Sequence, residues 1–217
     1  DVLVNIDLNQ VFHLHNTTNG PITVVYKKLP KKDISDVNAI LEIDETDHVR
    51  SHKLFDNKST DELFNMSTDI FVVDTPWLIE RLEEEAQKEY PEKLRYVLRD
   101  LAAKEGAFAY EYTGYLANIH SVQSYYQANI DMLESKKFYS LFSPNQKIYT
   151  KVKNEEPTYY ANTSKVSNSQ FASGSIIEGE VVQSVLSRNI YVHKDSVVKN
   201  SILFPRVVIG QGAQVEY

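Results

Sequence analysis

The sequence has no cysteine, which excludes disulfide bonds and thiol catalysis and fits a reducing compartment. No apolar run reaches the ~18 residues of a membrane-spanning helix. No serine lies in a Gly-x-Ser-x-Gly elbow, so a nucleophilic triad is not supported. A signal peptide is not expected, because the first residues, DVLVNIDL, have the pattern of a strand. Together these absences predict a cytoplasmic protein.

An excess of positive charge is also missing. The 217 residues carry a formal net charge of -7 at pH 7, and the pI is about 5.4. This acidic balance argues against nucleic acid or an anionic membrane as the main partner. Hydrophobic residues make up 42% of the chain and charged residues 24%, which is an ordinary globular composition. The length is enough for two modest domains or one large one.

The sequence does contain an internal repeat near its C-terminal end. The blocks 184–200 and 201–217 share one apolar pattern, in which Val192 corresponds to Ile209, and Ile177 has the same role in an earlier, looser copy. Apolar residues recur about every six positions, which is the hexapeptide pattern of a β-solenoid. Each block has seventeen residues. Three hexapeptides would give about eighteen per coil, so the repeat predicts a coil with one tightened corner.

We divide the chain into three parts. Residues 1–134 alternate predicted strands and helices, which indicates an α/β domain with a mostly parallel sheet. Residues 135–163 form a linker, and residues 164–217 form the solenoid, which is truncated because the sequence stops within the repeat. We expect both parts to expose apolar edges and the chain to self-associate.

Helix boundaries are predicted from capping residues. Thr75 is expected to cap one helix, with Pro76 at its first helical position. Ser121 is expected to cap the last helix of the α/β part. Gly106 is expected to end the helix 92–104, because glycine readily takes the left-handed conformation that follows a helix.

Four segments carry a family resemblance: residues 1–15, 114–133, 143–150 and 175–213. Over these segments the chain resembles bacterial glucose-1-phosphate adenylyltransferase, also called ADP-glucose pyrophosphorylase. The resemblance implies the C-terminal portion of a nucleotidyltransferase-like, Rossmann-like domain, followed by a left-handed β-helix of hexapeptide repeats. The Gly-rich ATP loop of the family has no counterpart in this sequence. We therefore expect a fragment that lacks that N-terminal region.

The resemblance also implies a reaction. Enzymes of the family join ATP and glucose 1-phosphate to give ADP-glucose and pyrophosphate for glycogen biosynthesis, with Mg²⁺ and as tetramers. Two carboxylates hold the metal in the family. Asp1 falls at the first position and is our candidate metal ligand, whereas Asn118 replaces the second carboxylate. A neutral amide is a much poorer ligand for Mg²⁺ than a carboxylate.

Two further family positions are altered. The lysine that binds the sugar phosphate lies in a Glu-Lys-Pro motif, and the counterparts here are Leu54 and Phe55, with Lys53 adjacent. A Ser-Met-Gly motif near the sugar appears as Ser-Thr-Asp, which places Asp69 at the glycine position. A carboxylate at that position would repel phosphate. Catalytic residues of the family are therefore degenerate at Asn118, Leu54, Phe55 and Asp69, and no substrate-binding residue is assigned.

These departures resemble the non-catalytic GlgD-type subunit of the family. The resemblance implies a regulatory chain without a cofactor of its own, in a hetero-oligomer with a catalytic subunit that uses Mg²⁺. One alternative is a catalytically active, divergent adenylyltransferase. A second alternative is a hexapeptide-repeat acyltransferase, for which His193 is the candidate catalytic residue.

Overall fold

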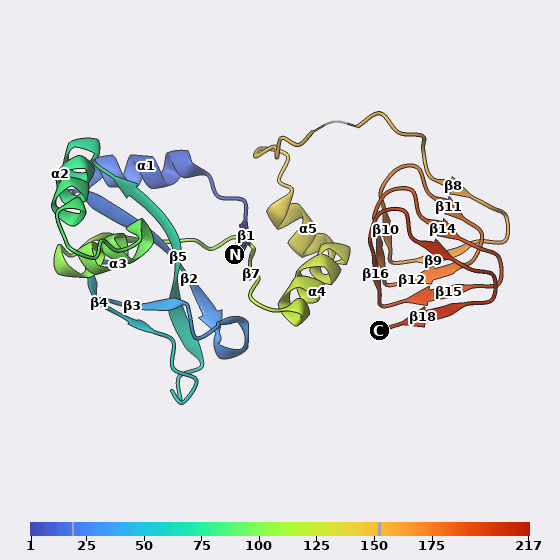
Figure 1. Ribbon diagram of the computed structural model, residues 1–217, viewed down its shortest axis with the longest axis horizontal. Coiled ribbons are helices and arrows are strands. Elements are labelled where there is room, and N and C mark those ends of the chain that lie inside the picture. The colour runs from blue at the N-terminus through green and yellow to red at the C-terminus, as the bar shows by residue number, and fades with distance from the viewer. Residues whose placement is uncertain (19, 152) are drawn as a thin grey trace. The chain divides into compact units, whose positions relative to one another are not determined.

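A computed structural model describes residues 1–18, 20–151 and 153–217. The chain forms two compact units, Asp1–Asn118 and Ile119–Tyr217, and each is described by itself. The α/β class and the solenoid expected from the sequence are both present (Figure 1). Residue 152, inside the expected linker, lies outside the described residues. Within the described ranges, no helix has the length and apolar character needed to cross a membrane.

The first unit is built on a five-stranded sheet. Its strands in spatial order are β4 (Val49–Leu54), β3 (Ala39–Ile43), β5 (Leu63–Val73), β2 (Ile22–Pro30) and β6 (Phe108–Glu111). Strands β2 and β6 are parallel, whereas β2 with β5, β5 with β3, and β3 with β4 are antiparallel. The sheet is therefore mixed rather than mostly parallel. The reason is that β3 and β4 form an antiparallel hairpin, and β5 lies between β3 and β2 and runs antiparallel to both.

Helices lie on both faces of this sheet. Helix α1 (Leu8–Thr17) packs on one face, and α2 (Thr75–Ala86) and α3 (Leu94–Lys104) pack on the other (Figure 1). Helix α3 is followed by Gly106 at φ +63°, which confirms the predicted glycine end of this helix. A short 3₁₀ helix, η1 (Lys31–Asp33), follows β2.

The predicted start of α2 is off by one residue. Asp74 is the N-cap, and Thr75 is already helical. The backbone N–H of Asp74 donates to the carbonyl of Pro21, at 2.9 Å. This bond holds Asp74 in an extended conformation beside β2, so the helical turn can begin only after it.

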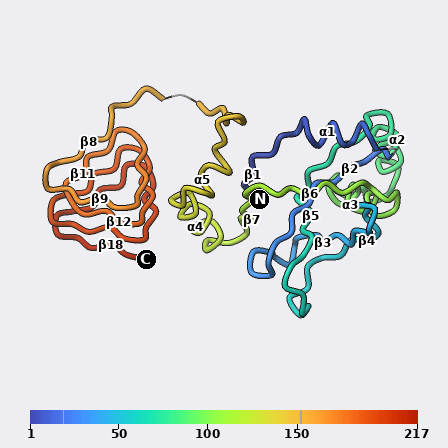
Figure 2. The backbone as a smooth tube through the Cα atoms, turned by 180° about the vertical axis from the view of Figure 1, so that it is seen from behind, coloured from blue at the N-terminus to red at the C-terminus, as the bar shows by residue number. Residues whose placement is uncertain are grey.

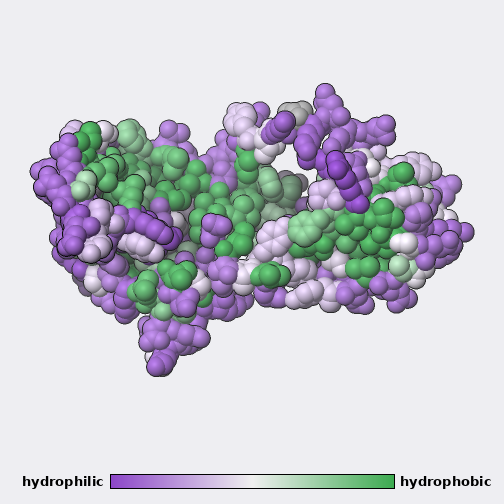
Figure 3. Space-filling model, in the orientation of Figure 1, coloured by the Kyte–Doolittle hydropathy of each residue, from purple (hydrophilic) through white to green (hydrophobic). Residues whose placement is uncertain are grey.

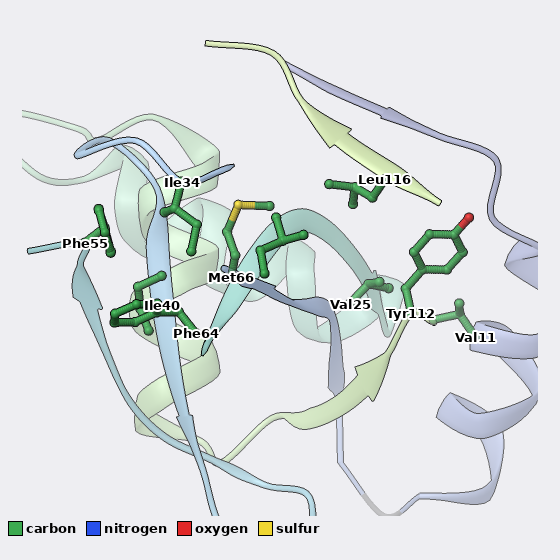
Figure 4. Packing of buried hydrophobic residues seen from close by; sticks show 10 residues of the cluster. Val11, Val25, Ile34, Ile40, Phe55, Phe64, Met66, Tyr112 and Leu116 are labelled. Carbon is green, nitrogen blue, oxygen red and sulfur yellow. The ribbon is translucent and has the colours of Figure 1, made fainter. Parts of the chain in front are cut away.

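Each face of the sheet has its own apolar core, because successive strand residues alternate between the faces. On one face Val25, Ile40 and Met66 pack with Phe55 and Phe64 (Figure 4). The other core contains Ile22, Val24, Tyr26, Leu41 and Val49 of the sheet together with Leu98 and Ala102 of α3.

A separate two-stranded ribbon completes the first unit. Strand β1 (Val2–Val4) pairs antiparallel with β7 (Leu116–Asn118), and Val2 lies opposite Asn118. Leu116 anchors the ribbon in the same core as Phe55 and Phe64. The ribbon therefore brings the first residues of the chain beside Asn118.

The second unit contains the solenoid, whose coils are stacked in Figure 2. One sheet is β8 (Tyr159–Tyr160), β11 (Ile176–Ile177), β14 (Tyr191–Val192) and β17 (Val208–Ile209). The next is β9 (Lys165–Ser167), β12 (Glu180–Val182), β15 (Val197–Lys199) and β18 (Gln214–Glu216). The third is β10 (Gln170–Phe171), β13 (Val185–Leu186) and β16 (Ile202–Leu203).

The sequence repeat is confirmed by the strand register. Ile177 pairs with Val192, and Val192 pairs with Ile209. All three side chains are buried in the apolar interior. Residues at equivalent corners of successive coils have the left-handed backbone conformation, such as Asn189 and Arg206 at φ +58° and +67°. A buried serine also repeats from coil to coil, and the backbone N–H of Ser201 donates to the Oγ of Ser184 at 3.1 Å.

One corner is two residues shorter than the equivalent corners of the next coils. From Ile177 to Val181 the chain advances four positions, whereas the equivalent steps, Val192 to Val198 and Ile209 to Val215, advance six. A Cβ on Gly179 in the short corner would lie 2.6 Å from the carbonyl oxygen of Ser196 in the next coil. Glycine therefore permits the close approach of backbone that shortens this corner.

Helices cover one face of the solenoid. These are α4 (Val122–Ile130), η2 (Asp131–Leu133) and α5 (Ser135–Leu141). Ser121 caps α4 in a reciprocal pair with Ser124, which confirms the predicted cap. Contacts with the solenoid come from the Tyr126 hydroxyl, which donates to the Asn200 carbonyl at 2.8 Å, and from Gln170, which donates to the Met132 carbonyl at 2.7 Å.

A second face of the solenoid carries an outward row of apolar and aromatic side chains, one from each coil. The outward row is Tyr159, Ile176, Tyr191 and Val208, which pair in register across the sheet. Tyr159 and Val208 are each 62% exposed. Apolar residues reach the surface of the solenoid in Figure 3. The outward row is a surface that a protein partner could cover.

Candidate functional site

The two family metal positions lie side by side on the β1–β7 ribbon. Asp1 is exposed and immediately precedes Val2, the residue that pairs with Asn118. Asn118 ends β7 and is only 6% exposed. The structure therefore brings Asp1 and Asn118 to one end of the ribbon, as the sequence resemblance implies.

The side chain of Asn118 acts as a donor to a neighbouring turn. Its Nδ2 donates to the backbone carbonyl of Asp33 at 3.0 Å and to Oδ1 of Asn38 at 2.8 Å. Asn38 Oδ1 also accepts from the backbone N–H of Ser35 at 2.9 Å and from the Ser35 hydroxyl at 2.8 Å. Asn118 thus ties β7 to the turn that leads from η1 into β3.

This arrangement does not fit a Mg²⁺ site. Mg²⁺ prefers oxygen ligands in octahedral geometry, usually with at least one carboxylate. Asp1 supplies one carboxylate, but the nitrogen of Asn118 is directed at two oxygen acceptors. Among the residues that the structure describes, no group of three or more histidine, aspartate or glutamate side chains could hold a metal ion.

The positions at which the resemblance places the phosphate-binding lysine hold residues with structural contacts of their own. Phe55 is 8% exposed and packs edge-on against Phe64, with ring centroids 5.1 Å apart (Figure 4). Leu54 ends β4 and is 59% exposed. Lys53 donates to Glu42 on the neighbouring strand at 3.1 Å. Hydrogen bonds from Ser51 and Lys53 hold the pKa of Glu42 below its usual value.

The carboxylate of Asp69 is paired with an arginine. Asp69 has a φ of +58°, a conformation in which aspartate is tolerated and glycine is favoured. Its two oxygens accept from Nε and Nη2 of Arg99, at 2.8 and 2.7 Å. Arg99 on α3 is 5% exposed. The charge expected to repel phosphate is therefore neutralised within the fold.

A partly buried lysine lies on the same side of the sheet as the ribbon. Lys27 on β2 donates to the carbonyl of Tyr112 at 3.2 Å, and its ammonium lies 5.5 Å from the Tyr112 ring centroid. Burial lowers the pKa of Lys27. The cation is already used by a backbone oxygen and an aromatic ring, so it does not replace the lost lysine of the family.

The candidate residue of the acyltransferase alternative lies on the surface of the solenoid. The His193 ring stacks on Tyr191 with centroids 3.8 Å apart, and its Nδ1 lies 3.9 Å from Glu178 Oε2.

Sequence reasoning missed the residues that bind the altered positions. Asn38 had a weak signal, because the run Ser-Asp-Val-Asn is typical of a turn stabilised by its own side chains. Arg99 had none, since it is thirty positions from Asp69 and lies in an ordinary helical pattern. Long-range pairs of this kind become visible only in the folded chain.

Comparisons with known proteins agree with the resemblance found in the sequence. The family model "GlmU-like, C-terminal hexapeptide" matches residues 151–217. Glycogen biosynthesis protein GlgD of Bacillus subtilis is 35% identical over 137 residues, which is 61% of this chain and 38% of the relative. Glucose-1-phosphate adenylyltransferase of Clostridium acetobutylicum is 26% identical over 201 residues, 91% of this chain and 52% of the relative.

A third relative, glucose-1-phosphate adenylyltransferase of Bacillus mycoides, is 35% identical over 108 residues, 50% of this chain and 29% of the relative. The chain thus spans about half or less of the length of these curated relatives. The matches confirm the resemblance to glucose-1-phosphate adenylyltransferases and to GlgD.

Proposed function

From this similarity to glucose-1-phosphate adenylyltransferases and to GlgD of glycogen biosynthesis, we propose that the protein is a regulatory, largely non-catalytic subunit. It binds a catalytic glucose-1-phosphate adenylyltransferase subunit in a hetero-oligomer and raises the activity of that subunit. The complex makes ADP-glucose and pyrophosphate from ATP and glucose 1-phosphate in the cytoplasm. In this proposal Mg²⁺ acts in the catalytic subunit only.

The observation that carries the proposal is the role of Asn118. In an enzyme that brings together two phosphate-bearing substrates, this position must supply negative charge to a metal ion. Asn118 supplies no charge, and its nitrogen donates to Asp33 and Asn38. A residue held in this way contributes to the fold instead of to phosphate chemistry.

Two other positions support the same proposal. Phe55 is part of the apolar core, so no phosphate can be bound at its side chain. Asp69 uses both carboxylate oxygens to bind Arg99. Each of these altered residues has a structural partner, which supports the proposal that this part of the chain contributes to the fold and not to catalysis.

A subunit without catalysis can raise a partner's activity only if it binds the partner's active conformation more tightly than the inactive one. This requires an interface. The outward row of the solenoid, which ends at Val208, is our candidate for that interface, because its apolar and aromatic side chains lie in register and reach the surface.

The test is the conversion of ADP-glucose and pyrophosphate to ATP by the full-length protein, first alone and then mixed with a catalytic subunit from the same organism. We expect no turnover alone and a higher rate in the mixture than with the catalytic subunit by itself. Turnover by the protein alone would instead support the active, divergent adenylyltransferase. No effect in the mixture would contradict the regulatory role.

A further inference from the structure

The hydrogen bonds around Asn118 fix which atoms are donors and which are acceptors. The Ser35 backbone N–H can only donate, so the Asn38 atom that receives it is the oxygen. The Asp33 carbonyl can only accept. Both acceptors of Asn118 are therefore oxygens, and the Asn118 atom that faces them must be its NH₂ group.

We propose that Asn118 is a latch that holds the turn of residues 31–38 against β7, and that a carboxylate at this position would release the turn. An ionised aspartate has only acceptor oxygens. In the geometry of Asn118, one oxygen would lie about 3 Å from both the Asp33 carbonyl and Asn38 Oδ1, where the amide nitrogen now lies. Two hydrogen bonds would be replaced by two repulsive contacts in a buried place.

Other contacts also hold this turn at both of its ends. On one flank, Lys31 donates to the carbonyl of Ser59 at 3.1 Å. On the other, the backbone N–H of Phe55 donates to the carbonyl of Asn38 at 3.0 Å. Ile34 is 6% exposed and packs into the core. Release of the latch should therefore loosen the turn locally without unfolding the sheet.

The consequence concerns the same position on which the proposed function rests, but it depends on neither a partner nor a substrate. A side chain that binds metal here must be an acceptor, and a side chain that closes the turn must be a donor. An ionised carboxylate cannot do both, because it has no N–H to donate. Asparagine at 118 therefore does more than omit a ligand, because it fixes a conformation that the ligand-bearing residue excludes.

The test makes the same substitution, asparagine to aspartate, at each end of the hydrogen bond between Asn118 and Asn38. Asn118→Asp replaces the donor by an acceptor, whereas Asn38→Asp keeps an acceptor opposite three donors. Tryptic cleavage after Lys31 and Lys32 in the full-length protein reports opening of the turn. Cleavage of the urea-unfolded variants provides the reference rate, and thermal unfolding shows whether each variant is folded.

We expect cleavage at these lysines to be roughly tenfold faster in Asn118→Asp, and unchanged or slower in Asn38→Asp. Asn118→Ala, which removes the donor without adding repulsion, should lie between wild type and Asn118→Asp, and it covers the case in which Asn118→Asp does not fold. Equal responses of the two aspartate variants, or an Asn118→Ala protein as resistant as wild type, would overturn the latch. Neither result bears on whether the chain activates a partner.

Discussion

The guanidinium of Arg99 binds both carboxylate oxygens of Asp69, and the two residues come from α3 and from the middle of β5. Arg99 is 5% exposed, so this carboxylate is the counterion of a nearly buried charge. The Tyr96 ring lies 5.7 Å from the Arg99 guanidinium carbon and adds a cation–π contact. The pair fastens the helix to the sheet at a residue with positive φ.

We predict that Asp69→Gly destabilises the first unit by about 3 kcal/mol, although glycine suits the φ of +58°, because Arg99 is left buried without a counterion. Adding Arg99→Leu should recover part of the loss. Urea unfolding of the two single variants and the double variant measures the coupling free energy. Additive effects would show that the ion pair is not what holds α3 to β5.

The short corner of the solenoid gives a second prediction. Gly179→Ala should cost about 1–3 kcal/mol, because the new methyl group would lie 2.6 Å from the carbonyl oxygen of Ser196. Gly210→Ala is the matched control, since its added Cβ has no atom within 4 Å. Thermal unfolding of the two variants checks this, and equal midpoints would contradict the close approach.

The hairpin turn between β3 and β4 should make stability depend on pH. Hydrogen bonds from the His48 backbone, the Thr46 side chain and the Thr46 backbone, together with Arg50, hold the pKa of Asp44 well below its usual range. A lowered folded-state pKa stabilises the fold above the unfolded pKa of about 4, and this stabilisation is lost as the pH falls through the folded pKa.

We therefore expect Asp44→Asn to be less stable than wild type at pH 7, with a difference that narrows below about pH 4. Chemical unfolding measured from pH 7 to pH 3 checks the trend. A difference that stays constant over this range would mean that the ionised carboxylate contributes nothing specific to the turn.

A charge placed in the outward row should weaken binding to a catalytic homologue. Val208→Lys should weaken co-purification with a catalytic homologue about tenfold or more, because it places a charge in an apolar interface. Gln214→Lys, on exposed β18 of another face, is the control with the same added charge. The same variants test the expected self-association by light scattering, where a monomeric wild-type protein would contradict that expectation.

The solenoid was predictable in detail because its signal is periodic. The match of Val192 with Ile209 is a sequence observation that becomes a pair of neighbouring strand residues. The start of α2 was missed by one residue, because the bond from Asp74 to Pro21 is a tertiary contact. The prediction of a mostly parallel sheet was wrong for a similar reason. Local patterns identify strands, but strand direction depends on which strands become neighbours in the folded sheet.

From the sequence, the candidate site could be predicted only as a set of positions that lack the residues of the family pattern. The sequence shows that Asn118, Phe55 and Asp69 differ from the family pattern. It does not show that Asn38 binds Asn118 and that Arg99 binds Asp69, because these partners lie far away in the chain. Nor does it show that the Phe55 ring packs on Phe64, because this contact forms only when the chain folds. A departure from a family pattern is local information, whereas the contacts of the altered residue are not.

The short corner at Gly179 has a consequence for how such a solenoid changes in length. Despite the missing residues, Ile177 and Val181 both still face the interior. Insertion of two residues there would restore the common spacing and leave every strand in phase. Elsewhere the step between interior residues is five positions, as from Val181 to Leu186, or six, as from Leu186 to Val192, and all of these side chains stay inside. Along this part of the chain the corners absorb differences in length, so the coils differ in the number of residues they contain while the strands keep the same interior positions.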